Sequence, residues 1–327
     1  MKPTVAITIG DFNGIGPEIA LKAAAHVTVR RICIPVLIGP LNVWEHARTT
    51  FKIKAKLQKV VFPWKDPSVI GVADVGDGIW ADVDFGKTTK SAGKSAGAAI
   101  EKAVELCKAN KAEAMVTGPV SKESLNLAGY SFPGQTEMIT LLSRSQRVAM
   151  MLVADRLRIG LVTIHAPLRN VADQITKEKI VEKVSIVNEA LKRNFGIQSP
   201  TLAVLGLNPH AGEHGLIGSE EEQIINPAID ESRSQGINVR GSFSADAFFG
   251  TGAYKSYDAI IAMYHDQGLI PLKLSSFWKA VNFSAGLNII RTSPGHGTAY
   301  DIAGKGKADI SSMVEAIKLA ARFGTRV

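Results

Sequence analysis

Residues 5–17 read Val-Ala-Ile-Thr-Ile-Gly-Asp-Phe-Asn-Gly-Ile-Gly-Pro, and this stretch decides the fold class. Residues 5–9 form a short apolar run rich in β-branched side chains, which is typical of a buried strand. Residues 10–16 form a glycine-rich loop, and Pro17 is favoured in the first turn of a helix because that turn needs no amide donor. The segment therefore predicts a strand, a loop and a helix in succession.

The same order recurs further along the chain. Residues 34–38 and 114–117 are strand-like runs, and each precedes a glycine–proline pair. After the second pair we expect a helix to open near Ser121. Because buried strands alternate with helices, the sequence predicts an α/β protein with a mainly parallel sheet.

The spacing of apolar residues predicts further elements. Ser219 and Glu222 have the spacing of a capping box, in which both side chains satisfy the first amides of a helix, and apolar residues follow them. The pair Asp155-Arg156 precedes one strand-like run and follows another, which predicts some antiparallel pairing. Helices are expected over residues 96–109, 176–191 and 310–321, and strands over 158–164, 202–207, 259–264 and 280–290.

Length and composition limit the class of protein. The chain has 327 residues, of which 46% are hydrophobic and 21% charged. At about 150 residues per domain this length predicts two domains, and the composition excludes a disordered or collagen-like chain. No apolar run approaches the ~20 residues that cross a bilayer, and the N-terminus has no secretory signal pattern. Cys33 and Cys107 lie in apolar contexts, as buried thiols do in a reducing compartment, so we expect a cytoplasmic protein without membrane contact.

The net charge of +8 is compatible with two kinds of partner, nucleic acid or an anionic substrate. The densest basic stretch runs from Lys52 to Lys59, and its period of two predicts one solvated face of a strand. No interleaved aromatic residues or zinc-finger spacing accompany it, so nucleic-acid binding is disfavoured.

Three of the seven histidines follow strand-like runs. His165, His210 and His265 each come after such a run, and ligands collect at the carboxyl ends of strands in open α/β sheets. The three imidazoles could therefore converge on one divalent metal, with Asp246 as a further carboxylate nearby. The spacing between them matches no short metal signature, and ordinary hydrogen-bonded histidines or a general base remain alternatives.

Another group of polar residues has the chemistry of an anion site. Lys273, Asn282 and Arg291 each lie near the end of an extended run, and arginine with lysine is a common grip for phosphate or carboxylate. Each could equally be a surface residue. The glycines at 10, 14 and 16 do not make a dinucleotide fingerprint, and residues 88–95 fail the phosphate-loop spacing.

Several ordered motifs together resemble the 4-hydroxythreonine-4-phosphate dehydrogenase family of pyridoxal phosphate biosynthesis, over essentially the whole chain. The matching segments are GIGPE at 14–18, TGPVSK at 117–122, GQTE at 134–137, NPHAGE at 208–213, YHDQG at 264–268 and RTSPGHGTA at 291–299.

The resemblance implies a two-domain fold like that of isocitrate and isopropylmalate dehydrogenases, with the active site in the cleft between the domains. The expected first domain comprises residues 1–130 plus 290–327, and the second, residues 131–289, carries a homodimer interface at which the active site lies.

The resemblance also implies the site residues. The divalent metal, which could be zinc, cobalt or magnesium, is expected on His165, His210 and His265, with Asp246 as a further catalytic residue. The substrate is expected to contact Gln135, Thr136, Lys273, Asn282 and Arg291. NAD, or NADP in its place, is expected to bind at Gly118, His296, Gly297 and Thr298.

The implied reaction is metal-dependent oxidation of 4-phosphohydroxy-L-threonine to 2-amino-3-oxo-4-phosphooxybutanoate, which decarboxylates to 3-amino-2-oxopropyl phosphate.

Two departures from the family sequence keep alternative substrates and reactions open. Gln135 stands where the family usually has histidine, and Asp11-Phe12-Asn13 stand where its first loop usually has proline. Glutamine cannot carry a positive charge, so a sister dehydrogenase acting on 4-phospho-D-erythronate, the threonate or an aromatic dihydrodiol is an alternative. A metallohydrolase that activates water with the same histidines is a more distant one.

Overall fold

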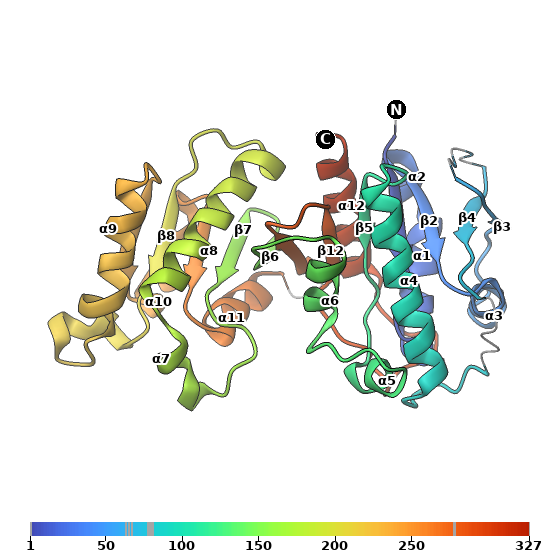
Figure 1. Cartoon of the computed structure of the whole chain (residues 1–327), viewed down its shortest axis with the longest axis horizontal. Coiled ribbons are helices and arrows are strands. Elements are labelled where there is room, and N and C mark those ends of the chain that lie inside the picture. The colour runs from blue at the N-terminus through green and yellow to red at the C-terminus, as the bar shows by residue number, and fades with distance from the viewer. Residues whose placement is uncertain are drawn as a thin grey trace. The chain divides into compact units, whose positions relative to one another are not determined.

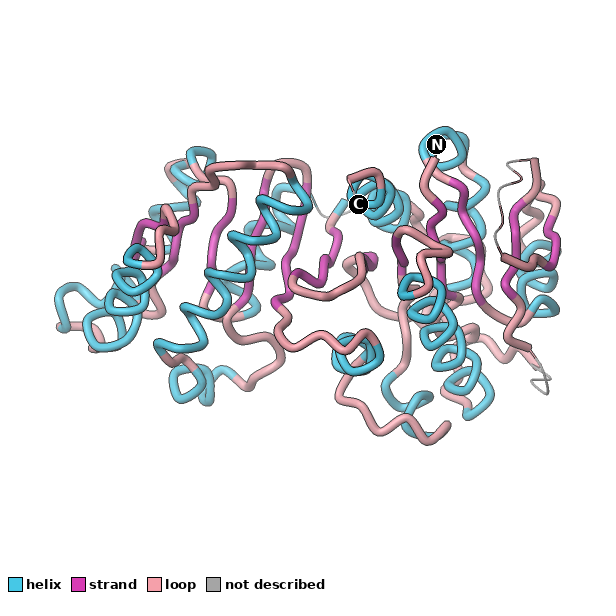
Figure 2. The backbone as a smooth tube through the Cα atoms, turned by 45° about the horizontal axis from the view of Figure 1, so that its top comes forward, coloured by secondary structure: helices cyan, strands magenta, loops and turns pink. Residues whose placement is uncertain are grey.

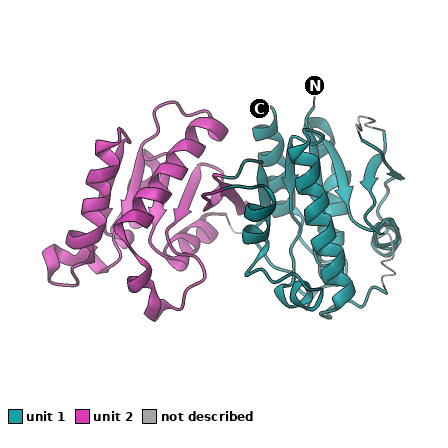
Figure 3. Ribbon diagram, in the orientation of Figure 1, with its two compact units in different colours: residues 1–145, 287–327 teal, residues 146–286 magenta. Residues whose placement is uncertain are grey.

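The computed structural model describes residues 2–62, 64, 66, 68–76, 82–276 and 279–326. The chain forms two compact units (Figure 3). Unit 1 consists of Met1–Ser145 and Leu287–Val327, and unit 2 of Gln146–Gly286. In the part of the chain that the structure describes, no helix has the length and apolar character needed to span a membrane.

The division falls at residue 145 rather than at the expected residue 130. The reason is α6 (Gln135–Leu142), which packs on α4 (Lys90–Lys108) of unit 1 and buries Met138 and Ile139. The Lys108 ammonium also donates to the Leu142 carbonyl at 3.1 Å. Residues 131–145 therefore belong to unit 1.

Unit 1 is built on a parallel sheet of six strands (Figures 1 and 2). The sequence prediction is confirmed at its centre, where Ile7 of β1 pairs with Leu37 of β2 on one side and Val116 of β5 on the other. In order across the sheet the strands are β3 (Leu57–Lys59), β4 (Ile70–Ala73), β2 (Ile34–Ile38), β1 (Thr4–Thr8), β5 (Ala114–Val116) and β12 (Arg291–Pro294).

Helices cover both faces of this sheet. Right-handed crossovers toward β2 and toward β5 run in opposite directions along the sheet, so their helices lie on opposite faces. One face carries α1 (Gly16–Ala25), α2 (Val27–Ile32), α3 (Leu41–Thr50) and α12 (Ser311–Gly324), and the other carries α4 with α5 (Lys122–Leu127) and α6.

Unit 2 has a mixed sheet in which four neighbouring strands are parallel. The hairpin predicted at Asp155-Arg156 is confirmed, because β6 and β7 pair antiparallel around it. The predicted strand at 280–290 is shorter, since β11 ends at Ala285 and pairs antiparallel with β6. The order is β11 (Val281–Ala285), β6 (Ala149–Ala154), β7 (Leu157–Leu161), β10 (Ala259–Ala262), β8 (Leu202–Leu205) and β9 (Val239–Phe243).

Alternate residues of β7 show which helices cover each face of the unit 2 sheet. Gly160 faces Val187 of α8, whereas the neighbouring Ile159 and Leu161 face Gly268 of α11. Because successive side chains of a strand point to opposite faces, α8 and α11 lie on opposite sides. The helices are α7 (Val171–Gln174), α8 (Lys177–Ala190), α9 (Asn226–Ser234), α10 (Ala245–Gly250) and α11 (His265–Ser276).

Two local predictions are wrong. The strand expected through Lys52–Lys59 is limited to residues 57–59, because Lys52 has a positive φ of 51° inside a turn. The capping box at Ser219 and Glu222 does not form either. The helical segment there includes a π-helical stretch at Glu221–Ile225 without a side-chain cap. The buried Glu221 side chain instead accepts hydrogen bonds from residues 207 and 208, as described below.

Candidate active site

Four of the predicted catalytic residues follow the carboxyl ends of four neighbouring parallel strands of unit 2. His165 follows β7, His265 follows β10, His210 follows β8 and Asp246 follows β9, which is the order β7-β10-β8-β9 across the sheet. Carboxyl ends of parallel strands meet at one edge, where α/β proteins bind ligands. Topology therefore brings these side chains to the same edge of unit 2.

His165 and His265 lie side by side at this edge. Their ring centroids are 5.9 Å apart, and both line a cavity of about 520 Å³. The Nδ1 atom of His265 lies 2.6 Å from an oxygen of Asp266. With the carboxylate accepting from Nδ1, the lone pair is on Nε2, which is the arrangement of a metal-binding histidine with an outer-shell carboxylate.

His210 lies on an unusual turn. Residues 210–214 have φ values of 54°, 51°, 79°, 44° and 55°, so the backbone is left-handed over five successive residues, four of which carry a side chain. The left-handed conformation costs about 1–2 kcal/mol for each non-glycine residue. Such a turn persists only where its surroundings hold it, and it is a hallmark of functional loops.

Asp246 lies in the first turn of α10, where its surroundings favour the ionised form. The Ser244 hydroxyl, the Ala247 amide and the nearby His210 all lower the pKa of its carboxyl group. His210 and Asp246 thus interact electrostatically, while His210 lines a second cavity of about 440 Å³.

These donors suit a divalent metal, since neutral imidazoles and a carboxylate are its usual ligands. The orientation of His265 by Asp266 is the structural observation that supports this fit. The structure brings His165 and His265 together, with His210 on the neighbouring turn. Among the described residues, no three histidine, cysteine, aspartate or glutamate side chains are grouped closely enough to hold an ion.

Arg291 and Thr136, both predicted to bind substrate, are neighbours in unit 1. The Arg291 side chain is only 1% exposed, and burial lowers the pKa of its guanidinium to about 10, so it stays charged near neutral pH. It donates to the Thr117 hydroxyl at 2.8 Å and to the Thr136 hydroxyl at 3.4 Å. Thr136 lies in the first turn of α6, whose N-cap Gly134 offers no side chain to the free amides. A buried cation beside uncapped amides suits a phosphate or carboxylate.

Gln135 is the first residue of the same helix, and its Oε1 atom is buried without a hydrogen-bond partner among the described residues.

The other two predicted substrate residues lie in unit 2. Asn282 is on β11 and also has a buried side-chain oxygen without a partner in the described part of the chain. Lys273 lies in the exposed last turn of α11. The expected cleft between the units stays a prediction.

The predicted cofactor residues are all in unit 1. The Ile15 amide of the first glycine loop donates to the Thr298 carbonyl at 2.9 Å, and the Gly118 amide donates to the Thr8 hydroxyl at 3.1 Å. Burial lowers the pKa of His296, so its ring is neutral. Its Nε2 atom is buried without a partner among the described residues, and Gly297 borders open space. Because Nδ1 faces the Gly297 carbonyl, Nε2 is an acceptor, and a nucleotide hydroxyl or amino group could donate to it, so these residues fit a dinucleotide.

Asp11 is a structural residue of this site that sequence reasoning missed. Its buried carboxylate accepts hydrogen bonds from the Ser124 hydroxyl at 2.6 Å, the Tyr300 hydroxyl at 2.8 Å and the Asn13 amide at 2.9 Å. It therefore connects the first glycine loop to α5 and to the chain just after Thr298. A charged residue two positions after the apolar run 5–9 was the available signal.

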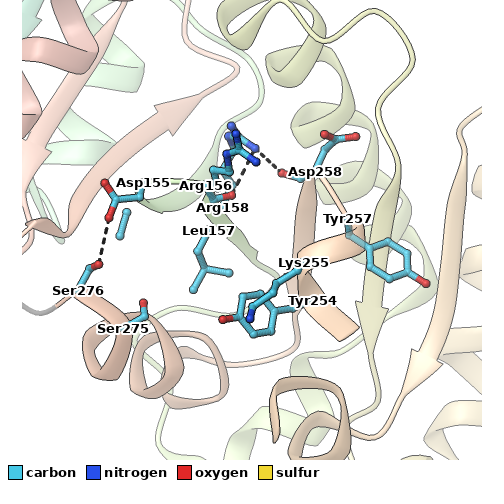
Figure 4. Close-up of a pocket in the computed structure, with 11 residues that line it drawn as sticks. Asp155, Arg156, Leu157, Arg158, Tyr254, Lys255, Tyr257, Asp258, Ser275 and Ser276 are labelled. Carbon is cyan, nitrogen blue, oxygen red and sulfur yellow. Dashed lines mark hydrogen bonds between the residues drawn. The ribbon is translucent and has the colours of Figure 1, made fainter. Parts of the chain in front are cut away.

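A further cavity of about 680 Å³ lies at the opposite end of the unit 2 sheet (Figure 4). It is lined by Leu157 and Arg158 at the start of β7 and by Tyr257 and Asp258 just before β10, so it faces away from the strand ends that carry the histidines. It contains none of the predicted site residues.

Two α/β units, with histidines at a strand-end edge of one and a buried arginine beside a helix start of the other, are typical of an α/β enzyme. Comparison with known proteins narrows this class. The family model for the pyridoxal phosphate biosynthetic protein PdxA matches residues 31–320. The chain belongs to this family and is a dehydrogenase.

Individual relatives are similar over nearly their whole length. The 4-hydroxythreonine-4-phosphate dehydrogenase of Trichlorobacter lovleyi is 41% identical, covering 98% of each chain. The D-threonate 4-phosphate dehydrogenase of Cupriavidus necator is 40% identical, covering 99% of this chain and 98% of the relative. The crystal structure of 4-hydroxythreonine-4-phosphate dehydrogenase from Klebsiella pneumoniae matches with a TM-score of 0.90 at 36% identity, covering 99% and 98% of the two chains. The α/β fold expected from the sequence is confirmed.

Proposed function

We propose that this enzyme oxidises the secondary hydroxyl of 4-phosphohydroxy-L-threonine with NAD or NADP as the hydride acceptor. The observation that carries the proposal is a candidate anion-binding site. It consists of buried Arg291, Thr136 and the first amides of α6, which have no side-chain cap. Such a site suits the phosphate of a small substrate. Several relatives at this level of identity are named for 4-hydroxythreonine 4-phosphate.

The product of the oxidation is 2-amino-3-oxo-4-phosphooxybutanoate. Its carboxylate lies β to the new carbonyl, so it loses carbon dioxide to give 3-amino-2-oxopropyl phosphate. Remote binding of the phosphate would contribute to catalysis by orienting the reacting carbon. In this scheme Arg291, Thr136, Lys273 and Asn282 supply that binding.

The residues at the strand-end edge of unit 2 would surround the reacting hydroxyl. His165, His210 and His265 would hold a divalent metal, which when bound supplies Lewis-acid catalysis for alcohol oxidation. Asp246 remains ionised because its pKa is lowered, so it adds negative charge that favours a cation at this edge. Asp266 fixes the ring of His265.

A homodimer completes the proposal. His165 and His265 lie side by side, and a second copy could bring a further ligand to this edge, in keeping with an active site at a subunit interface. A cytoplasmic location is supported by Cys33 and Cys107, which are both buried and unbridged, and burial raises the pKa of each thiol to about 12.

A second substrate has specific support. The relative named for D-threonate 4-phosphate is 40% identical to this chain, against 41% for a relative named for the threonine phosphate, so identity does not separate the two. Gln135 is the residue that bears on the choice. Its uncharged side chain replaces the family histidine where an anionic or amino-bearing substrate would be recognised.

The test is NADH formation, followed by absorbance, with 4-phosphohydroxy-L-threonine beside D-threonate 4-phosphate and 4-phospho-D-erythronate. Each substrate is assayed with and without a chelator. Chelator-sensitive turnover of the threonine phosphate is the expected result. Turnover of only a sugar-acid phosphate would move the chain to the sister activity, and turnover of no substrate would refute the dehydrogenase assignment of the site.

A further inference from the structure

The strand ends that carry the three histidines are connected by a chain of buried and partly buried hydrogen bonds. At its centre is the Met263 backbone, two residues before His265. The Thr163 hydroxyl and amide both donate to the Met263 carbonyl, at 2.7 and 3.1 Å. Thr163 is 5% exposed and lies two residues before His165. This contact fixes the segment of His165 to the segment of His265.

Gln267 extends the connection to the third segment. Its Oε1 atom accepts from the Met263 amide at 2.7 Å, and its Nε2 atom donates to the Gly206 carbonyl at 2.6 Å. Gly206 directly follows β8, at the start of the segment that leads to His210. A single amide side chain therefore satisfies one backbone donor from the His265 segment and one backbone acceptor from the His210 segment.

Glu221 holds the same segment, just before the turn of His210. Its carboxylate is 2% exposed and accepts from the Leu207 and Asn208 amides, at 2.7 and 2.8 Å, and from the Asn208 side chain at 2.9 Å. A side chain on Gly212, in the middle of the turn, would come within 2.6 Å of this carboxylate. The left-handed turn therefore packs closely against the buried side chain of Glu221.

We propose that Gln267 and Glu221 are positioning residues that set His210 and His265 for a shared divalent metal. The inference rests on the proposed metal function and deepens it. Neither side chain belongs to the predicted ligand set, and neither contacts the metal in this account. They act by fixing the backbone that leads into the His210 turn, and outer-shell partners typically change metal affinity 10–100-fold.

The test compares metal binding by the full-length protein and two variants. Gln267→Leu keeps the size of the side chain and removes both hydrogen bonds, and its matched control is Gln223→Leu at an exposed position. Glu221→Gln replaces one accepting oxygen by a donor that would face the Asn208 amide group, and its matched control is the exposed Glu222→Gln. Co²⁺ is titrated into each apoprotein against a competing chelator, and its absorption spectrum is recorded.

Both variants should bind Co²⁺ at least tenfold more weakly than the wild type, with an altered Co²⁺ absorption band, while both controls match the wild type. A residue with a purely structural role would lower the melting temperature and leave affinity and spectrum unchanged. Folded variants with wild-type affinity and spectrum would therefore overturn the inference and leave the proposed dehydrogenase intact. If the wild type itself binds no Co²⁺, the proposed metal function fails and the inference with it. If Glu221→Gln does not fold, Gln267→Leu alone decides between these outcomes.

Discussion

At the scale of single residues, the buried carboxylate of Asp11 offers a prediction with a defined pH dependence. Burial raises the pKa of Asp11 above its usual value, although the Ser124 and Tyr300 hydroxyls act in the opposite direction. Tyr300→Phe removes one of these donors. We expect it to lower the free energy of unfolding near neutral pH by about 1–3 kcal/mol, the usual cost of leaving a buried acceptor without its partner.

The sign of the pH effect follows from the direction of the shift. With one donor lost, the pKa of Asp11 in the folded state rises further, so the penalty is largest where the carboxyl is ionised. The difference in stability between variant and wild type should shrink as the pH falls and the folded carboxyl becomes protonated. Denaturant titrations at several pH values measure it. Tyr254→Phe is the control, since the Tyr254 hydroxyl makes no hydrogen bond to the described residues, and a penalty independent of pH would contradict the account.

Gln135 allows a prediction about substrate binding. Its Oε1 atom is buried without a partner in the described part of the chain, so it is left to accept a hydrogen bond from a substrate donor, but it provides no positive charge. Gln135→His introduces a group that can be protonated beside an anionic substrate, and a hydrogen bond to a charged group is stronger by about 1 kcal/mol. We expect the KM for 4-phosphohydroxy-L-threonine to fall severalfold with little change in kcat. Steady-state kinetics tests this with Gln223→His as the control, and an unchanged KM would remove Gln135 from the substrate contacts.

The histidines could be found from the sequence, whereas the residues that hold them could not. His165, His210 and His265 follow recognisable strands, so topology alone places them at one edge. Glu221 instead has local neighbours that suggest a helix cap, and its real partners, the amides of residues 207 and 208, lie across a turn. A left-handed backbone in residues with side chains contradicts local preference, and only the surrounding structure makes it stable.

At the scale of elements, helix α4 shows how a residue with poor helix propensity can be required. Gly93 lies in its first turns, and a side chain there would come within 1.7 Å of the Ser124 carbonyl of α5. Gly93→Ala should favour the isolated helix by about 1 kcal/mol. In the protein the backbone clash should outweigh that gain and lower stability by a net 1–3 kcal/mol or more.

Thermal and denaturant unfolding of Gly93→Ala measure this balance. The control is Gly250→Ala in α10, where a side chain would have no neighbour within 4 Å, and it should be neutral or slightly stabilising. If both substitutions stabilise the protein, the approach of α5 to α4 is looser than the structure indicates.

The bounds of a strand can be set by its own residues or by the element beside it. The strand at 34–38 is set by its own β-branched and apolar residues, and prediction and structure agree on it. The strand expected through Lys52–Lys59 is shortened because Phe51 and Lys52 close the end of α3 in a turn. Alternating charge is a weaker signal than a helix end, because it carries no information about backbone hydrogen bonds.

At the scale of the whole molecule, the predicted site residues divide by ligand between the two units. The three predicted metal ligands His165, His210 and His265 lie with Asp246 in unit 2, and the predicted cofactor residues Gly118, His296, Gly297 and Thr298 lie in unit 1. Only the substrate residues are shared, with Gln135, Thr136 and Arg291 in unit 1 and Lys273 and Asn282 in unit 2. The expected division at residue 130 would have placed Gln135 and Thr136 with the metal residues.

This division predicts that metal and cofactor stabilise different parts of the chain. A ligand at 100 times its dissociation constant adds about 2.7 kcal/mol to the unit that binds it. In amide hydrogen exchange followed by mass spectrometry, Co²⁺ should slow exchange mainly in peptides from residues 146–286, and a chelator should reverse the effect. NADH should slow exchange mainly in peptides near residues 8–15, 118 and 296–300, and the chelator should leave that protection in place. Protection by NADH confined to residues 146–286 would show that the cofactor residues are assigned to the wrong unit, and protection by Co²⁺ confined to unit 1 would do the same for the histidines.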